Sequence, residues 1–132
     1  MSRITEIVNT LPQLLSLKPA TAVQITDAEI QLRVSFADEY KDYLANFGAV
    51  MADGIELTGI AKAEYRNVVS VTKKERALNP NIPNTLYVVE DTHMDGVIIW
   101  QDAQGFIYKS HPGSEPCKVA ESFADYLLSV RK

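Results

Sequence analysis

The chain has 132 residues, a formal net charge of −4 and a single cysteine. This length predicts one domain, residues 1–132, that folds without a disulfide or a metal, and the negative charge argues against nucleic acid as a direct ligand. A lone cysteine favours a reducing compartment, and the sequence has neither a signal-peptide pattern nor an apolar run that would cross a membrane. We therefore expect a cytoplasmic protein.

The first 25 residues predict a short helix followed by an irregular segment. Residues 3–11 carry apolar side chains on one helical face: Ile4, Ile7, Val8 and Leu11. Residues 12–25 show no clear period, so we expect an irregular lead-in. Thr26 and Glu29 then fit a capping box, which predicts a short helix over residues 26–32.

The clearest helix spans residues 36–47. Ser35 and Asp38 are spaced to cap its start, and Gly48 supplies a left-handed exit at its end. One apolar stripe runs along it: Phe36, Tyr40, Tyr43, Leu44 and Phe47. At helical spacing we interpret this stripe as core, not as a ligand site.

The middle of the chain gives mixed signals. A short strand is expected within residues 54–60, around Ile55–Leu57. Residues 68–72 have strand propensity, whereas Asn67 is a good helix N-cap and basic residues follow where a helix would end. We favour a helix over residues 67–77.

The second half of the chain predicts an antiparallel sheet. Residues 86–90, 97–101 and 106–109 form apolar runs rich in β-branched and aromatic residues. Between the last two runs, residues 102–105 begin with Asp and end with Gly, which is typical of a type I turn in a β-hairpin. A further short strand is expected near residues 116–119.

A C-terminal helix is predicted because Ser122 and Asp125 are spaced to cap its start. Its buried side is expected to carry Phe123, Leu127 and Val130. Arg131 and Lys132 would oppose the negative end of its dipole. Helices before and after a sheet predict an α+β fold, with a mostly antiparallel central sheet flanked by helices.

The charge is distributed unevenly. Between Arg76 and Lys109 the sequence has no Lys or Arg. Four acids lie in that stretch: Glu90, Asp91, Asp95 and Asp102. An acidic surface would steer a basic partner toward it. The alternative is ordinary solvated charge at strand ends and turns.

Two kinds of reactive site can be weighed from the residues. Cys117 and His111 could form a hydrolase pair, but no local signature surrounds the cysteine, and an inert cysteine is the simpler interpretation. Asp91, His93 and Asp95 resemble the first half of a calcium loop, with Asp102 at the twelfth place. Histidine is a poor calcium ligand, and the flanks are strands where that motif needs helices. We therefore predict no metal and no cofactor.

Three segments in order resemble the SUKH superfamily. They are Ala28-Glu29-x-x-Leu32-x-Val34 with Phe36-x-x-x-Tyr40-x-x-Tyr43-Leu44-x-x-x-Gly48, then Gly96 through Trp100 with Asp102-x-x-Gly105-x-Ile107-Tyr108, then Ala120-x-Ser122-Phe123-x-x-Tyr126-Leu127. Together they cover the chain from about residue 26 onward. One departure is Ala37, which stands near the place where the family often has proline.

The resemblance implies an α+β fold and a binding function. Bacterial members are encoded beside polymorphic toxins, often nucleases, and protect the producing cell by binding the toxin. A yeast member regulates cell-wall synthesis, so the alternative is a scaffold or regulatory interaction module. The leading hypothesis is thus a non-enzymatic immunity protein whose partner is a cognate toxin, a basic nuclease being compatible with the acidic segment.

The interface candidates follow from this hypothesis. The first set is Glu90, Asp91, Asp95, Trp100 and Asp102, and the second set is Glu56 and Glu64. The acids would supply charge pairs, and Trp100 would be an aromatic anchor. The alternative for Trp100 is core packing, because strand alternation can equally turn its side chain inward.

Overall fold

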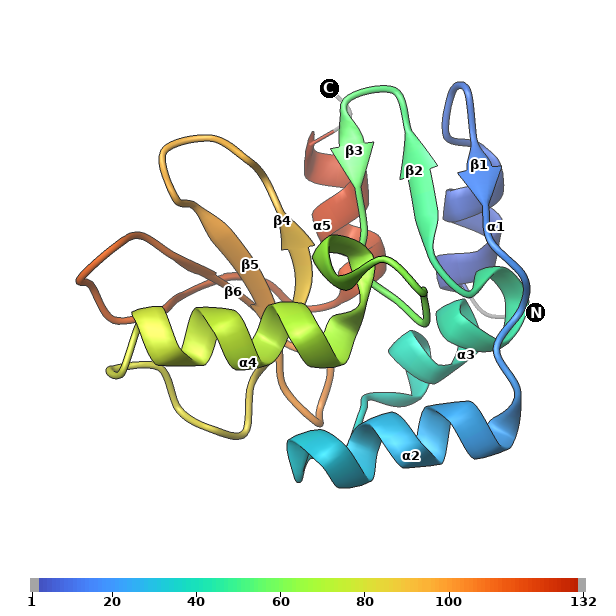
Figure 1. The fold of residues 1–132 in the computed structure, drawn as a ribbon. Coiled ribbons are helices and arrows are strands. Elements are labelled where there is room, and N and C mark those ends of the chain that lie inside the picture. The colour runs from blue at the N-terminus through green and yellow to red at the C-terminus, as the bar shows by residue number, and fades with distance from the viewer. Residues whose placement is uncertain (1–2, 131–132) are drawn as a thin grey trace.

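Five helices and two antiparallel sheets make up the part of the chain that the computed structural model describes, residues 3–130 (Figure 1). The helices are α1 (Arg3–Asn9), α2 (Ala22–Leu32), α3 (Asp38–Phe47), α4 (Val68–Leu78) and α5 (Phe123–Val130), with a 3₁₀ turn, η1 (Glu64–Arg66). The strands are β1 (Leu15–Ser16), β2 (Val50–Ala52), β3 (Ile55–Glu56), β4 (Tyr87–Asp91), β5 (Ile98–Gln101), β6 (Ile107–Ser110) and β7 (Cys117–Ala120). The predicted α+β fold is confirmed.

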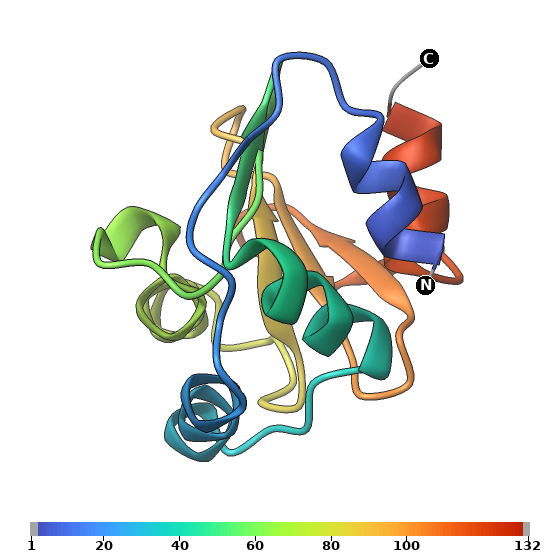
Figure 2. The same cartoon turned by 90° about the vertical axis from the view of Figure 1, so that its right-hand side faces the viewer.

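The strands pair in the orders β1-β2-β3 and β4-β5-β6-β7. An antiparallel bridge between Leu57 and Glu90 joins the two sheets. Helices lie on both sides of the strands, with α2 and α4 on one side and α1 and α5 on the other (Figure 2). Residues of the turn η1, of α4 and of the β4–β5 loop line one pocket, so these three segments lie near one another.

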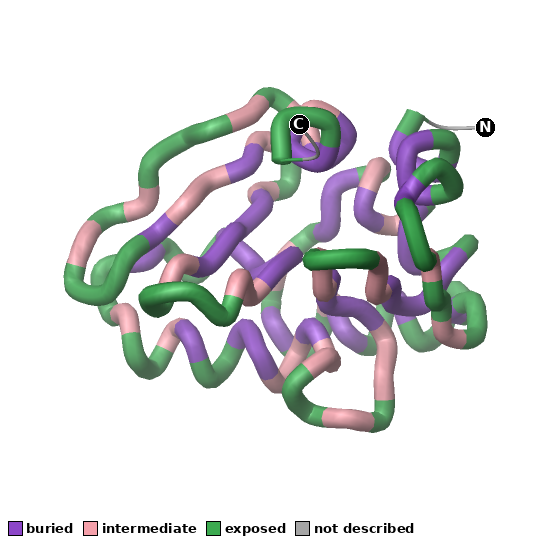
Figure 3. The backbone as a smooth tube through the Cα atoms, turned by 90° about the horizontal axis from the view of Figure 1, so that it is seen from above, coloured by how far each residue is buried: buried purple, intermediate pink, exposed green. Residues whose placement is uncertain are grey.

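Strands β4 and β5 are buried on both faces. Tyr87 and Val89 face a large core shared with α1, α2, α3 and α5, and Ile99 of β5 joins them. Val88 and Trp100 face a second apolar cluster beneath α4. Covering both faces explains why these strands appear in the sequence as continuous apolar runs. Figure 3 shows exposed positions in the loops and on the helices, and buried positions along the central strands.

The aromatic stripe formed by Phe36 and by Tyr40, Tyr43 and Phe47 of α3 is core, as predicted. The rings of Phe36 and Tyr87 lie 4.7 Å apart, and those of Tyr43 and Phe123 lie 5.6 Å apart. Tyr40 and Tyr43 keep their hydroxyls satisfied on Thr58, at 2.9 Å and 2.7 Å. The aromatic residues therefore bind α3 to the sheets and to α5.

Two predicted helix starts are wrong. Helix α2 begins at Ala22, where Thr21 and Gln24 form the capping box, so Thr26 lies inside the helix. Helix α3 begins at Asp38 behind Ala37, and no side chain caps it. The exit at Gly48 does have a positive φ, 71°. A Cβ there would lie 2.2 Å from the carbonyl oxygen of Lys18, which restricts the position to glycine.

The predicted irregular segment, residues 12–25, is only partly irregular. It contains the start of α2 and the short strand β1, which pairs with β2. Strands β1 and β2 are too short to show an alternation of apolar and polar residues in the sequence. They are recognised only by their pairing. The favoured helix over residues 67–77 is confirmed as α4, and Asn67 accepts hydrogen bonds from the backbone of Val69 and Ser70.

The ends of the last elements agree with most of the predictions. Ser122 Oγ accepts from the Asp125 amide at 3.0 Å at the start of α5. Val130 is 46% exposed, so its predicted place on the buried side is wrong. Arg131 and Lys132 lie outside the described residues. The hairpin turn is confirmed by a 3.0 Å hydrogen bond from the Gly105 amide to the Asp102 carbonyl.

Candidate functional site

The sheet separates acids that lie close together in the sequence. Asp91 ends β4 and Asp95 lies in the β4–β5 loop, whereas Asp102 follows β5 at the other end of that ladder. At about 3.3 Å per residue, strand β5 holds these ends roughly 13 Å apart. The four acids of this stretch therefore do not form one surface, although Asp91 at the end of β4 lies next to the loop that carries Asp95.

Glu90 points into the protein instead of toward a partner. Only 6% of its surface is exposed, and its Oε1 accepts a hydrogen bond from the Tyr126 hydroxyl. Burial raises the pKa of the Glu90 carboxyl above its ordinary value, the bond from Tyr126 partly offsets this, and Asp91 adds to the rise. Its role in this structure is to tie β4 to α5.

Trp100 is also inside. None of its surface is exposed, and its Nε1 donates to Ser110 Oγ at 2.8 Å. Strand alternation directs the indole beneath α4, so it offers no exposed aromatic anchor. The core-packing alternative is the one that the structure supports.

Asp102 organises a turn. Its Oδ1 accepts from the backbone amides of Gln104 and Phe106, both at 3.0 Å. Its Oδ2 accepts from the Tyr108 hydroxyl at 2.9 Å. Both carboxylate oxygens are thus occupied within the hairpin that Asp102 starts.

A different constellation forms around His93. Its Nε2 lies 3.4 Å from Glu56 Oε1, and its Nδ1 lies 3.7 Å from Asp91 Oδ1. The His93 amide also donates to Asp91 Oδ1 at 2.9 Å. The structure thereby brings together two of the predicted site residues, Glu56 and Asp91, across the junction of the two sheets.

The loop that carries His93 has an unusual backbone. His93 and Asp95 have φ values of 57° and 55°, and Gly96 follows at 71°. Residues other than glycine seldom adopt a left-handed backbone conformation. Those that do are found disproportionately at functional sites. Thr92 Oγ1 donates to the Val97 carbonyl at 2.8 Å and closes the loop. The loop therefore presents residues 93–95 at a defined place.

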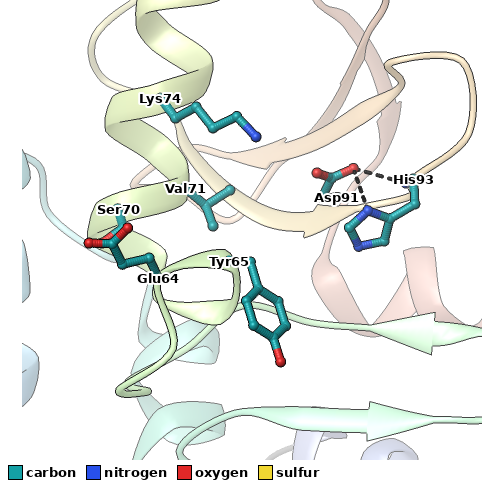
Figure 4. Close-up of a pocket in the computed structure, with 7 residues that line it drawn as sticks. All are labelled: Glu64, Tyr65, Ser70, Val71, Lys74, Asp91 and His93. Carbon is teal, nitrogen blue, oxygen red and sulfur yellow. Dashed lines mark hydrogen bonds and ion pairs between the residues drawn. The ribbon is translucent and has the colours of Figure 1, made fainter.

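A cleft lies between α4 and this loop. One part, of about 420 Å³, has walls from η1, α4 and β4, as Figure 4 shows. Its lining residues are Glu64, Tyr65, Ser70, Val71, Lys74, Asp91 and His93. A second part, of about 480 Å³, shares Lys74, Asp91 and His93 and extends to Glu75, Leu78 and Pro112. We call the two parts together the α4 cleft.

The surroundings of the α4 cleft are both apolar and acidic. Tyr65 and Leu78, which line it, are each 65% exposed, and Met94 in the adjoining loop is 67% exposed. Four predicted acids lie in or beside it: Glu56, Glu64, Asp91 and Asp95. Exposed aromatic and apolar side chains among charges are typical of protein-binding surfaces.

A comparison with protein families decides the membership of the chain. The model of the SUKH_5 family, described as SMI1-KNR4 cell-wall, matches residues 2–132. The chain belongs to this SUKH family. No curated protein matches it significantly.

Other properties of this SUKH chain can be stated for residues 3–130. Within them, no helix has both the length and the apolar character needed to cross a membrane. No three His, Cys, Asp or Glu residues in the same range are placed to hold a metal ion. His111 and Cys117 share no hydrogen bond there: the thiol contacts the Lys118 carbonyl at 3.8 Å, and the His111 backbone bonds with Ser114.

Sequence reasoning missed most residues that line the α4 cleft in this SUKH chain, among them Tyr65, Lys74 and Glu75. A signal for Glu75 exists in the sequence. The buried residues of α4 are Val68, Val71, Thr72 and Glu75, which follow the i, i+3, i+4, i+7 spacing of an apolar stripe. An acid at the last place of such a stripe predicts a buried carboxyl.

Proposed function

We propose that this SUKH chain is a non-enzymatic immunity protein that binds and neutralises a cognate polymorphic toxin. The observation that carries the proposal is the α4 cleft, where five acids and three large exposed side chains, Tyr65, Leu78 and Met94, lie in or beside a space lined by Lys74. Membership of the SUKH family supports a binding role in general. The toxin and the cytoplasmic site of action belong to the proposal.

The chemistry of the cleft favours a basic protein partner. The acids accelerate the encounter with a positively charged surface and select against acidic surfaces. Tyr65, Leu78 and Met94 supply the apolar contact area on which affinity depends. A nuclease toxin fits this description because it presents a basic surface to its own substrate.

The test is neutralisation of the toxin encoded by the neighbouring gene. Coexpression of the intact chain should restore growth, and the purified proteins should form a complex in titration calorimetry. The double variant Glu64→Lys, Asp95→Asn should weaken the complex at least about tenfold, since two charge changes at an interface cost more than about 1.4 kcal/mol together.

The matched control changes the net charge equally elsewhere. Asp27 on α2 and Asp42 on α3 are exposed, so Asp27→Lys, Asp42→Asn should leave the affinity within about twofold. A chain that neither binds nor neutralises that toxin would refute the immunity role. If both double variants weakened the complex equally, the α4 cleft would not be the surface that binds the toxin.

A second candidate is a regulatory interaction module, favoured by the family description SMI1-KNR4 cell-wall. Gene context separates the two functions. A toxin gene directly upstream supports immunity, whereas a gene neighbourhood without one supports the regulatory module.

A further inference from the structure

Glu75 is a buried residue whose carboxyl accepts one long hydrogen bond within residues 3–130. It is 7% exposed on the inner stripe of α4. Its Oε1 receives only a long hydrogen bond, 3.4 Å, from Asn79 Nδ2, and its Oε2 receives none from the residues that the structure describes. A carboxylate oxygen that no donor of the chain binds can still accept a hydrogen bond from a donor outside it, and a charged donor gives the stronger bond.

The cavity beside Glu75 contains a second carboxylate. Asp91 lines the same 480 Å³ space, and the two carboxyls are close enough for Asp91 to raise the pKa of Glu75, after burial itself. Asp91 Oδ1 is occupied by His93, whereas Oδ2 has no hydrogen bond among residues 3–130. Two carboxylates thus each hold one free oxygen toward one cavity.

We infer that the α4 cleft binds an arginine side chain of the partner between Glu75 and Asp91. This inference extends the proposed function and rests on it, because the arginine would come from the proposed toxin partner. It assigns the contact point of the basic partner to one cavity and to two named carboxylates.

Arginine fits the cavity better than other cations. Its planar guanidinium has five donors and can bond two carboxylates at once, whereas an ammonium acts as a point charge. The remaining walls include Leu78, Ile98 and Pro112, which would contact the aliphatic stem of the side chain. A guanidinium there supplies the donors that Glu75 Oε2 and Asp91 Oδ2 lack.

Lys74 is a positively charged residue that lines the site. Its side chain extends from α4 across the cleft toward Asp91 (Figure 4), yet it makes no ion pair with the described residues. It is exposed and can move aside at little cost. Its charge opposes a second cation, so removing it should strengthen arginine binding.

The experiment uses a defined probe on the full chain. N-acetyl-L-arginine methylamide is titrated while amide NMR shifts are recorded, and the citrulline counterpart, neutral and of the same shape, is the control ligand. The arginine compound should bind roughly tenfold more tightly, with shift changes centred on residues 74–79 and 91–98.

Three variants make the assignment specific. Glu75→Gln and Asp91→Asn should each weaken the binding of the arginine compound about fivefold or more, and Lys74→Met should strengthen it about threefold. Circular dichroism melting confirms that each variant is folded. Equal binding of the citrulline compound, or unchanged binding in both carboxyl variants, would overturn the inference.

Failure of this site and failure of the immunity role are distinguishable. If the chain binds the arginine compound but neutralises no toxin, the proposed function is refuted and the arginine site is supported. If the Glu75→Gln and Asp91→Asn variants neutralise the toxin as well as the wild type does, the function is supported and the arginine site is refuted.

Discussion

At the scale of single residues, Glu90 links stability to pH. Its pKa is raised by burial, so the folded state keeps the proton to a higher pH than the unfolded state does. Between the ordinary carboxyl pKa and the raised one, the unfolded state alone ionises. The free energy of unfolding therefore falls as the pH rises through that window, and its contribution is constant above it.

The variant Glu90→Gln removes this dependence. Relative to the wild type, its free energy of unfolding should improve as the pH rises from the ordinary carboxyl pKa through the raised pKa of Glu90, and the gain should then stay constant. Urea unfolding at several pH values measures the difference in free energy of unfolding between the two proteins. Glu75 is present in both proteins, so its contribution cancels in that difference. Parallel curves for the two proteins would contradict the prediction.

At the scale of elements, Glu39 of α3 caps a helix far away in the sequence. Its Oε1 accepts from the Phe123 amide at 2.7 Å, and its Oε2 accepts from the Ala124 amide at 2.9 Å. Gln101 Nε2 adds a third bond at 3.1 Å. A carboxylate at a helix start satisfies free amides and interacts with the positive end of the helix dipole.

We expect Glu39→Ala to lower the free energy of unfolding by about 2–3 kcal/mol, because two backbone donors lose a charged partner. The control is Asp38→Ala. Asp38 is the neighbouring exposed acid in the first turn of the same helix, and its loss should cost about 0.5 kcal/mol. Equal losses in urea unfolding would show that the distant cap contributes nothing.

Element types were easier to predict than element starts and pairings. Helix α4 was predictable because Asn67 caps it locally, and the hairpin was predictable because Asp102 and Gly105 fit a turn by themselves. The start of α2 was misassigned because two capping patterns stand five residues apart, at Thr21 and Thr26. The structure forms the first, in which Thr21 and Gln24 exchange both capping hydrogen bonds.

The candidate site was predictable only in part. The sequence indicates an acidic stretch, but it does not say which strand face each acid occupies. A bulge in β4 between Val88 and Glu90 shifts the register there, and Glu90 is directed to Tyr126. The cleft itself depends on how α4 meets the β4–β5 loop, which is a long-range property.

At the scale of the whole molecule, the segment from Leu57 to Gly59 connects the parts. Thr58 donates its amide to the Val89 carbonyl at 3.0 Å and its hydroxyl to the Val88 carbonyl at 2.7 Å. The Tyr40 hydroxyl also bonds the Thr58 hydroxyl. One buried side chain thus links the two sheets and α3.

The variant Thr58→Val keeps the shape of this side chain and removes its hydroxyl. Both the Val88 carbonyl and the Tyr40 hydroxyl then lose a partner in a dry interior. We therefore expect a loss of about 2–3 kcal/mol in the free energy of unfolding. Thr58→Ser, which keeps the hydroxyl and loses a methyl, should cost only about 1 kcal/mol. Urea unfolding compares the two, and a serine variant at least as unstable as the valine variant would mean that packing, not hydrogen bonding, holds this junction together.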